Sequence, residues 1–244
     1  MTSWPQGYGL KRYDEIDSTN EEARRLAALG EAGPVWLIAA RQTAGRGRRG
    51  RSWETAGGNL AATLLLRPDR DQGDWAQLSF VTAVAAADTA ADFAVGARIA
   101  LKWPNDVLAD GKKLAGILLE TASGPSSALA IGVGMNLAHH PDGTEFPATS
   151  LAALGAPTPS ADDALAALAA GFARWYEIWR AQGFVAIREA WLARAAGLGA
   201  RIRARLATEE RSGLFEGIDE NGALLLNEGF GRASVLPAAD IFFR

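Results

Sequence analysis

A short segment rich in glycine and arginine carries the strongest chemical signal in the sequence. The segment Gly45–Arg51 reads Gly-Arg-Gly-Arg-Arg-Gly-Arg, and its arginines are Arg46, Arg48, Arg49 and Arg51. Glycine exposes backbone N–H groups, and guanidinium groups form paired hydrogen bonds with phosphate or carboxylate oxygens. Because four like charges repel one another, we expect this loop to be mobile until an anion orders it. The segment predicts a loop around an anionic small ligand; a solvated surface loop and a nucleic-acid-contacting patch remain open.

The same segment formally matches the G-x-G-x-x-G fingerprint of dinucleotide-binding folds. That fingerprint must open a helix, so that the helix N-terminus faces the pyrophosphate. Here Gly50 is followed by Arg51, Ser52 and Trp53, then by Gly57-Gly58 and another expected strand. The context therefore excludes a Rossmann site.

A second motif combines the rare lysines with a carboxylate. Only four of the 25 Lys and Arg residues are lysine, and three of these four lie between residues 102 and 113. The motif Lys102-Trp103-Pro104-Asn105-Asp106 is followed by a turn at Gly111 and then by Lys113, so a hairpin would bring Asp106 near Lys113. A lysine held at a strand end directs one charge at a reacting phosphorus or carboxylate. An ordinary Asn-Asp turn beside a surface lysine explains the motif equally well.

Three further groups of residues could surround a polar ligand. Asp17-Ser18-Thr19-Asn20 is explained first as a helix start, with Ser18 and Glu21 as a capping box, and a helix N-terminus also offers donors to a ligand. Gln42, at the end of a buried strand, can pair with an amide-like or urea-like group. The strand Ile-Gly-Val-Gly-Met-Asn, which ends at Asn136, has two glycines that indicate a close approach to its backbone.

The expected elements alternate between strands and helices up to about residue 196. The expected strands are 10–16, 35–41, 59–66, 98–103, 114–121 and 128–136, and the expected helices are 20–29, 74–93, 161–181 and 184–196. Because strands are clustered and not each followed by a helix, we expect an α+β fold with a mixed or antiparallel sheet covered by helices. Short alternating strands at 201–206, 212–218, 223–226 and 232–236 predict a small barrel. We therefore place a domain boundary near residue 197.

Composition restricts the class of protein. The 244 residues are 48% hydrophobic and 22% charged with a net charge of −3, which disfavours a protein that coats nucleic acid or a membrane surface. The absence of cysteine excludes disulfides, a thiol nucleophile and a cysteine zinc site. The two histidines, His139 and His140, lie in a polar loop and are not expected to be catalytic. We expect no membrane span and no export signal, hence a cytoplasmic protein.

The chain offers no persuasive nucleophile, base and orienting group for covalent catalysis. A reaction whose nucleophiles both arrive with the substrates needs only positioning and charge neutralisation, as in nucleotidyl transfer. A substrate carboxylate would attack the α-phosphorus of a nucleotide, and an amine would then attack the mixed anhydride. Mobile arginines and a fixed lysine suit that chemistry, and loop closure would exclude water.

Five motifs stand in the order and approximate spacing of the bacterial biotin protein ligases, and the chain resembles that family. They are Asp17–Asn20, Gly45–Arg51, Lys102–Asp106, Lys113–Leu118 and Gly132–Asn136. The resemblance implies a catalytic domain related to class II aminoacyl-tRNA synthetases over residues 1–196 and an SH3-like domain over 197–244. It also implies that biotin and ATP form biotinyl-5'-adenylate, whose acyl group passes to a lysine of the biotin carboxyl carrier protein of acetyl-CoA carboxylase.

The resemblance also implies roles for individual residues. Lys113 and Arg48 would be catalytic, and Asp106 would help to place Mg²⁺ or Lys113. The implied biotin-binding residues are Ser18, Thr19, Asn20, Gln42, Arg46, Gly47, Arg48 and Lys113. The implied adenylate-binding residues are Arg46, Arg48, Arg49, Arg51, Trp53, Lys102, Asn105 and Asn136.

Some members of the family carry an N-terminal helix-turn-helix domain and repress transcription. Here the first ligand motif begins at residue 17, so we expect no such domain and no DNA binding. The main enzyme alternative is a lipoate protein ligase, against which the Gly/Arg loop argues. A nucleic-acid-binding module that uses residues 41–51 is the non-enzymatic alternative. The sequence leaves open whether the protein is a monomer or a homodimer.

Overall fold

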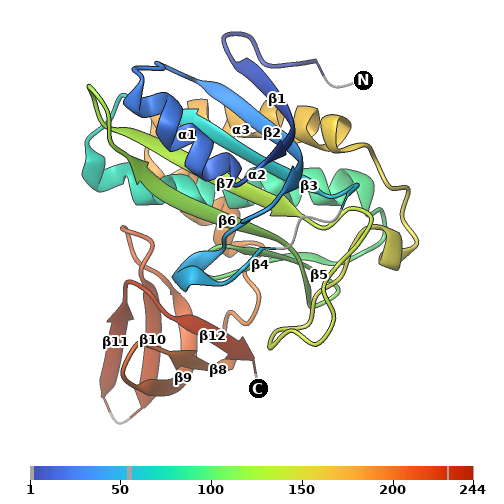
Figure 1. The fold of residues 1–244 in the computed structure, drawn as a ribbon. Helices are drawn as coiled ribbons and strands as arrows, with labels where there is room; N and C mark the ends of the chain where they lie inside the picture. The colour runs from blue at the N-terminus through green and yellow to red at the C-terminus, as the bar shows by residue number, and fades with distance from the viewer. Residues whose placement is uncertain (1–2, 54–56, 230, 244) are drawn as a thin grey trace.

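The computed structural model describes residues 3–53, 57–229 and 231–243, which form a large sheet with helices and a smaller sheet beside it (Figure 1). The strands of the large sheet are β1 (Gly9–Ile16), β2 (Val35–Gln42), β3 (Leu60–Leu66), β4 (Ile99–Lys102), β5 (Asp106–Ala109), β6 (Lys112–Ala122) and β7 (Ala128–Met135). Their order across the sheet is β1-β2-β3-β7-β6-β5-β4. Only β1 and β2 pair in parallel, and all other neighbours are antiparallel. The expectation of a mixed sheet is confirmed.

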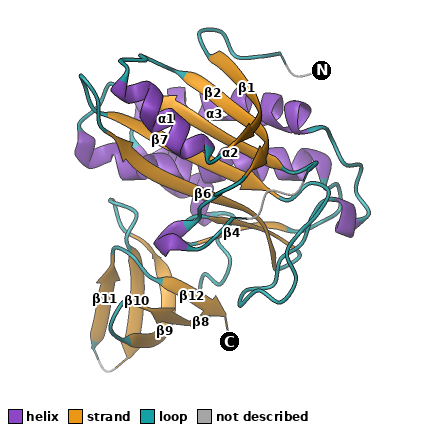
Figure 2. Cartoon of the chain, in the orientation of Figure 1, coloured by secondary structure: helices purple, strands orange, loops and turns teal. Residues whose placement is uncertain are grey.

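Helices cover both faces of this sheet (Figure 2). Helix α1 (Thr19–Ala28) packs on one face, whereas α2 (Leu78–Phe93) and α3 (Ala161–Gln182) pack together on the other. Strand β2 shows why both faces are filled, since alternate residues of a strand point to opposite sides. Val35 and Leu37 join the small cluster under α1, and Trp36 and Ile38 join the large core on the side of α2 and α3.

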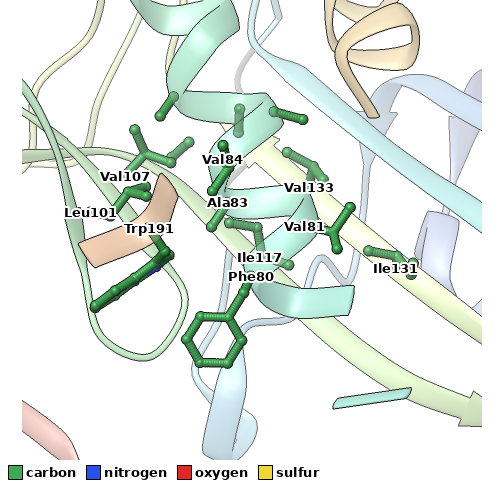
Figure 3. Close-up of a cluster of buried hydrophobic side chains, with 14 of the residues drawn as sticks. Phe80, Val81, Ala83, Val84, Leu101, Val107, Ile117, Ile131, Val133 and Trp191 are labelled. Carbon is green, nitrogen blue, oxygen red and sulfur yellow. The ribbon is translucent and has the colours of Figure 1, made fainter. Parts of the chain in front are cut away.

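Helix α2 is buried along most of its length, and its apolar side chains lie in one cluster with those of the sheet (Figure 3). The expected start of this helix at residue 74 is wrong. Residues Gln72–Gln77 form a 3₁₀ turn, and the α-helix begins at Leu78. Asp74 N–H bonds to the carbonyl of Asp71 at 2.9 Å, which is 3₁₀ pairing, and Trp75 Nε1 donates to the carbonyl of Arg70 at 2.9 Å. These local bonds replace the first α-helical turn.

The C-terminal sheet contains β8 (Arg201–Arg205), β9 (Glu210–Ile218), β10 (Leu224–Gly229), β11 (Arg232–Leu236) and β12 (Asp240–Phe243). Its order is β11-β10-β9-β8-β12, all antiparallel, and no pairing closes it between β11 and β12 within the described residues. This sheet is consistent with the expected small SH3-like domain. Strand β12 was not expected, because a strand of only four residues is too short to show a clear alternation of polar and apolar residues.

The two sheets share a core through the connecting helix α4 (Phe184–Leu192). Trp191 of α4 packs edge to face on Phe80 of α2, with ring centroids 5.6 Å apart. Trp103 is buried, and its indole N–H donates to the carbonyl of Gly222 at 2.9 Å. The C-terminal sheet is thereby fixed against the region that carries the Lys102–Asp106 motif. Within the described chain, no helix is both long and apolar enough to cross a bilayer.

Candidate functional site

A cavity of about 330 Å³ lies where α1, the Gly/Arg loop, β6, β7 and β12 meet. Its lining contains every residue that the sequence analysis assigned to the site except Arg49. These lining residues are Ser18, Thr19, Asn20, Gln42, Arg46, Gly47, Arg48, Arg51, Trp53, Lys102, Asn105, Asp106, Lys113 and Asn136. Segments separated by more than 100 residues in the sequence are thus brought to one site.

The N-terminus of α1 forms one end of the cavity. Ser18 caps the helix by accepting a hydrogen bond from the Glu21 N–H, so the predicted N-cap is confirmed. The reciprocal half of the predicted capping box is wrong, because the Ser18 N–H donates to Asp17 at 2.7 Å and the Glu21 carboxylate binds Arg46. The amide oxygen of Gln42 accepts from the backbone N–H of Thr19 at 2.8 Å. Asn20 is buried, and its Nδ2 donates to Glu120 at 2.8 Å. Helix start and strand end are thereby locked together as one polar wall.

Strand β7 approaches its neighbours so closely that side chains are excluded at two positions. A Cβ atom at Gly132 would overlap the side chain of Asn20, and a Cβ atom at Gly134 would overlap the indole of Trp53. The prediction that these glycines permit a close approach to the backbone is confirmed. The side chain of Asn20 therefore lies against β7 at Gly132, and that of Trp53 lies against it at Gly134.

The Gly/Arg loop is a compact hairpin. Arg46 and Ser52 form an isolated β-bridge, and Gly47 N–H donates to the carbonyl of Arg51 at 2.7 Å. Residues Arg48–Gly50 make a short 3₁₀ turn in which Arg49 has φ 56°. A left-handed conformation is uncommon for arginine and marks the tight turn of this loop.

Protein groups hold each of the loop arginines, and the expected mobility of the free loop stays a prediction. Arg46 donates to Glu21 at 2.7 Å, and Arg48 donates to the amide oxygen of Asn105 at 3.2 Å. The remaining two, Arg49 and Arg51, both bind Asp240 of β12. Arg49 therefore contacts the C-terminal sheet rather than the cavity, and its assignment to the adenylate site stays a prediction without a place in the lining.

Three charged side chains, from the successive strands β4, β5 and β6, form the centre of the cavity. Lys113 Nζ lies 2.6 Å from Asp106 Oδ1, and Lys102 Nζ lies 3.4 Å from Asp106 Oδ2. Lys102 is buried, and burial lowers its pKa from the ordinary value although Asp106 acts in the opposite direction. Lys113 is more accessible and lies over the ring of Trp53, 5.6 Å from its centroid. Lys113 is thus the ammonium group that can meet a substrate.

The expectation that Asp106 helps to place Mg²⁺ is not supported by its surroundings. Its two oxygens face the ammonium groups of Lys102 and Lys113, and two adjacent cations disfavour a third. In the described chain, no group of three or more His, Asp or Glu residues is arranged to hold a metal ion. The residues present do not fit a protein-held magnesium, and Asp106 fits the alternative expectation, which is to place Lys113.

The far side of the cavity is formed by a loop and a strand that the sequence analysis missed. Residues 141–148 follow β7, and Phe146 places its ring over Lys102, 4.6 Å from Nζ. Glu145 makes paired hydrogen bonds of 2.6 and 2.7 Å with Arg205 of β8. Asp240 and Phe242 of β12 complete this wall. Their own sequence shows no motif, and they reach the cavity through the pairing of β12 with β8.

The loop after β7 is itself anchored by one buried side chain. Asn59 Oδ1 accepts hydrogen bonds of 3.0 Å from the backbone N–H groups of Leu137, Ala138 and His139. Asn136 is buried in the cavity wall and donates to the carbonyl of Thr149 at 3.0 Å. His139 and His140 are absent from the lining, and their lack of a catalytic role stays a prediction.

Comparisons with known proteins match the parts of the chain that form the cavity. A sequence profile described as "Biotin/lipoate A/B protein ligase family" matches residues 14–136, and one described as "Biotin protein ligase C terminal domain" matches residues 197–244. The chain belongs to the biotin/lipoate protein ligase family. The first match spans all five motifs and ends at Asn136, and the second covers the C-terminal sheet that supplies Asp240.

Relatives in this family match along most of the chain. The biotin--[acetyl-CoA-carboxylase] ligase of Paracoccus denitrificans is 51% identical over 236 residues, which cover 93% of this chain and 97% of that protein. The bifunctional ligase/repressor BirA of Bacillus subtilis is 34% identical over 91% of this chain and 71% of its own length. The fold matches the biotin protein ligase from Aquifex aeolicus in complex with biotin and ATP, with a TM-score of 0.84 at 24% identity, covering 97% and 99% of the two chains.

Proposed function

We propose that this protein is an ATP-dependent biotin protein ligase that forms biotinyl-5'-adenylate and transfers biotin to a lysine of the biotin carboxyl carrier protein of acetyl-CoA carboxylase. The observation that carries the proposal is the single cavity in which the polar wall of α1, the loop arginines and the Lys113–Asp106 pair converge. The family membership and the 51% identity to a biotin ligase support the choice of biotin over lipoate.

The polar wall suits the ureido ring of biotin. Ser18, Thr19 and Gln42 offer hydroxyl, backbone and amide groups there, and a cyclic urea needs one acceptor partner for each N–H and donors for its carbonyl. Apolar lining residues such as Ala61, Ala62 and Val133 give a surface along which a ring and its aliphatic chain can lie. In this arrangement the carboxylate of biotin extends toward Lys113 and Arg48.

Adenylation requires a carboxylate to attack a phosphorus while two anions are held together. A biotin carboxylate oxygen forms a bond to the α-phosphorus of ATP, the bond from that phosphorus to the bridging oxygen breaks, and pyrophosphate leaves. Lys113 and Arg48 neutralise the charge that gathers on the α-phosphoryl oxygens. Asp106 holds the ammonium of Lys113 at 2.6 Å, which restricts it to the reacting centre. Magnesium would arrive with the phosphates of ATP, and no step here is assigned to it.

Transfer uses the second nucleophile. The neutral amine of the acceptor lysine attacks the acyl carbon of biotinyl-5'-adenylate, the bond to the phosphate oxygen breaks, and AMP leaves as the amide forms. The chain needs no nucleophile of its own for either step. The Gly/Arg loop covers the mixed anhydride and keeps water from hydrolysing it before the carrier protein docks.

The decisive experiment is a pair of assays on the purified full chain with Mg-ATP. Biotin should stimulate the exchange of labelled pyrophosphate into ATP, and labelled biotin should be transferred to a biotin carboxyl carrier domain. A carrier domain whose acceptor lysine is replaced by arginine serves as the matched control and should remain unlabelled. Exchange and loading with lipoate but not with biotin would replace this proposal by the lipoate ligase alternative.

Three further expectations belong to the same proposal. We take residues 1–196 as the catalytic domain and 197–244 as the C-terminal domain, with the enzyme acting in the cytoplasm. DNA binding is not expected, which a titration with duplex DNA at low salt tests directly. Oligomeric state stays open, and sedimentation with and without biotin and ATP determines it.

A further inference from the structure

Thr63 is a buried polar residue directly behind the cavity wall. It is the one polar residue of β3, whose sequence is Leu-Ala-Ala-Thr-Leu-Leu-Leu, and it is completely buried. Its neighbours Ala61 and Ala62 line the cavity, whereas Thr63 does not. A buried hydroxyl must find hydrogen-bond partners to offset its lost hydration. The partners of Thr63 are therefore informative about its role.

Both of its partners belong to the start of α1. Thr63 Oγ1 lies 2.6 Å from Oδ1 of Asn20 and 2.8 Å from Oγ1 of Thr19. An amide oxygen only accepts, so the single hydroxyl proton of Thr63 points to Asn20. The lone pairs of Thr63 then face Thr19, whose hydroxyl also lies 3.1 Å from Oε1 of Gln42. The Thr63 hydroxyl thus contacts two of the residues expected to bind biotin, and Thr19 in turn contacts a third, Gln42.

This arrangement fixes which way the Asn20 amide faces. With Oδ1 bound to Thr63, its Nδ2 donates to Glu120 at 2.8 Å on the opposite side. Gly132 is the register partner of Thr63 in β7, and its missing side chain provides the space that the Asn20 amide occupies. A strand with valine at position 63 would have the same shape but would leave Asn20 Oδ1 without its donor.

We infer that Thr63 is a positioning residue for the biotin subsite: its hydroxyl orients Asn20 and Thr19 at the N-terminus of α1 without touching the substrate. The inference rests on the proposed function, because it assigns biotin to the wall that these two residues form. Thr63 is thus a residue that affects biotin affinity although it does not line the cavity. Its effect is on the affinity for biotin and not on the chemical step.

The main test replaces Thr63 by valine, which has nearly the same volume and favours strands. We expect the Kd for biotin, measured by calorimetry, to rise about tenfold, because Asn20 and Thr19 would no longer be held in one orientation and must be ordered when biotin binds. Pyrophosphate exchange at saturating biotin should keep the unmodified maximal rate, and the KM for ATP should not change. Loss of a residue with only a structural role would not weaken biotin binding while leaving the KM for ATP unchanged.

Two further variants control for packing. Thr63→Ser restores the hydroxyl but removes a methyl group, and it should recover biotin affinity to within about threefold of the unmodified protein. Thr82→Val removes a similarly buried hydroxyl that donates to the Leu78 carbonyl of α2 at 2.7 Å, and neither residue lines the cavity. It should leave the Kd for biotin unchanged, whatever it does to the melting temperature.

The outcomes separate this inference from the function on which it rests. If the unmodified protein forms biotinyl-adenylate and Thr63→Val binds biotin as tightly, the inference is wrong and the function stands. If Thr63→Ser loses as much affinity as Thr63→Val, packing and not the hydroxyl is responsible, and the inference is also wrong. If the unmodified protein binds no biotin, the proposed function fails first.

Discussion

The carboxylate of Asp240, in the last strand of the C-terminal sheet, accepts a hydrogen bond from the guanidinium of Arg51, which lies 189 residues earlier in the Gly/Arg loop. Arg49 of the same loop donates to the same oxygen at 3.1 Å. Only 12% of the Asp240 side chain is exposed, whereas the two arginines are 36% and 56% exposed. The C-terminal sheet therefore holds the loop over the cavity through one buried carboxylate.

Replacing Asp240 with asparagine is expected to release the loop. Asparagine keeps the shape of the side chain but removes the charge that holds Arg49 and Arg51. Because both arginines are partly exposed, solvent already screens these pairs, and we expect only about a tenfold faster escape of biotinyl-adenylate. Rapid filtration of enzyme preloaded with labelled biotin and ATP measures this rate. Glu209→Gln removes an exposed carboxylate that binds Arg211 on the same sheet, and it should retain adenylate normally.

The same carboxylate predicts a pH dependence of stability. Burial alone would raise the pKa of Asp240, but the hydrogen bond and charge of Arg51, with the charges of Arg49 and Arg48, outweigh it and lower the pKa below its ordinary value. A lowered folded-state pKa means that the stabilisation is complete above the ordinary pKa near 3.8 and is lost as the pH falls through the lower folded value.

Melting temperatures of the unmodified protein and of Asp240→Asn should therefore differ by a constant amount from neutral pH down to about pH 5 and converge below the ordinary aspartate pKa. Calorimetric scans over that range provide the measurement. A difference that grows on acidification would show that Asp240 is not stabilised as a carboxylate.

Much of the site could be predicted from sequence because its chemistry is local. The Ser18 cap, the two glycines of β7 and the hairpin that brings Asp106 to Lys113 each depend on residues within about a dozen positions, where backbone geometry limits the possibilities. The continuous apolar run within 35–41 likewise predicted a buried strand, which the structure shows as β2. These features were expected before any fold was known.

The second wall of the cavity depends on contacts that sequence spacing does not encode. Asp240 and Phe242 reach the cavity only because the C-terminal sheet docks through Trp103 and Gly222. Phe146 lies in an irregular loop, where no periodicity indicates the direction of a side chain. The carboxylate partner of the Gly/Arg loop was also missed, since Asp240 lies almost two hundred positions away.

Removal of the Lys113 ammonium should affect catalysis far more than substrate binding. In Lys113→Ala, we expect pyrophosphate exchange to fall by about 10² to 10³, because a pre-aimed cation stabilises the transition state more than the ground state. The Kd for biotin should change by less than about threefold, which calorimetry checks. Lys112→Ala removes the exposed neighbouring lysine and should keep full exchange. A similar loss in both variants would indicate a general effect of charge.

A methyl group on the floor of the cavity should disturb Trp53. In Gly134→Ala the new Cβ would overlap the indole, so the ring must move away from β7 and from its position beside Lys113. Overpacking of this kind costs about 1 to 3 kcal/mol, and we expect a fall of roughly tenfold or more in kcat/KM for adenylation together with a lower melting temperature.

Gly171→Ala is the matched control, since the same methyl group in the interior of α3 meets Ala85 at 3.6 Å, an ordinary contact. Alanine favours the helix by about 0.5 to 1 kcal/mol, so this variant should melt slightly higher and react normally. Trp53 also reports on its own displacement, because movement from a half-buried site toward solvent shifts its fluorescence to longer wavelength. Comparison with a variant in which Trp53 is replaced by phenylalanine shows which part of the fluorescence of the eight tryptophans comes from Trp53. Normal kinetics with an unshifted spectrum in Gly134→Ala would show that Trp53 is not held against this strand.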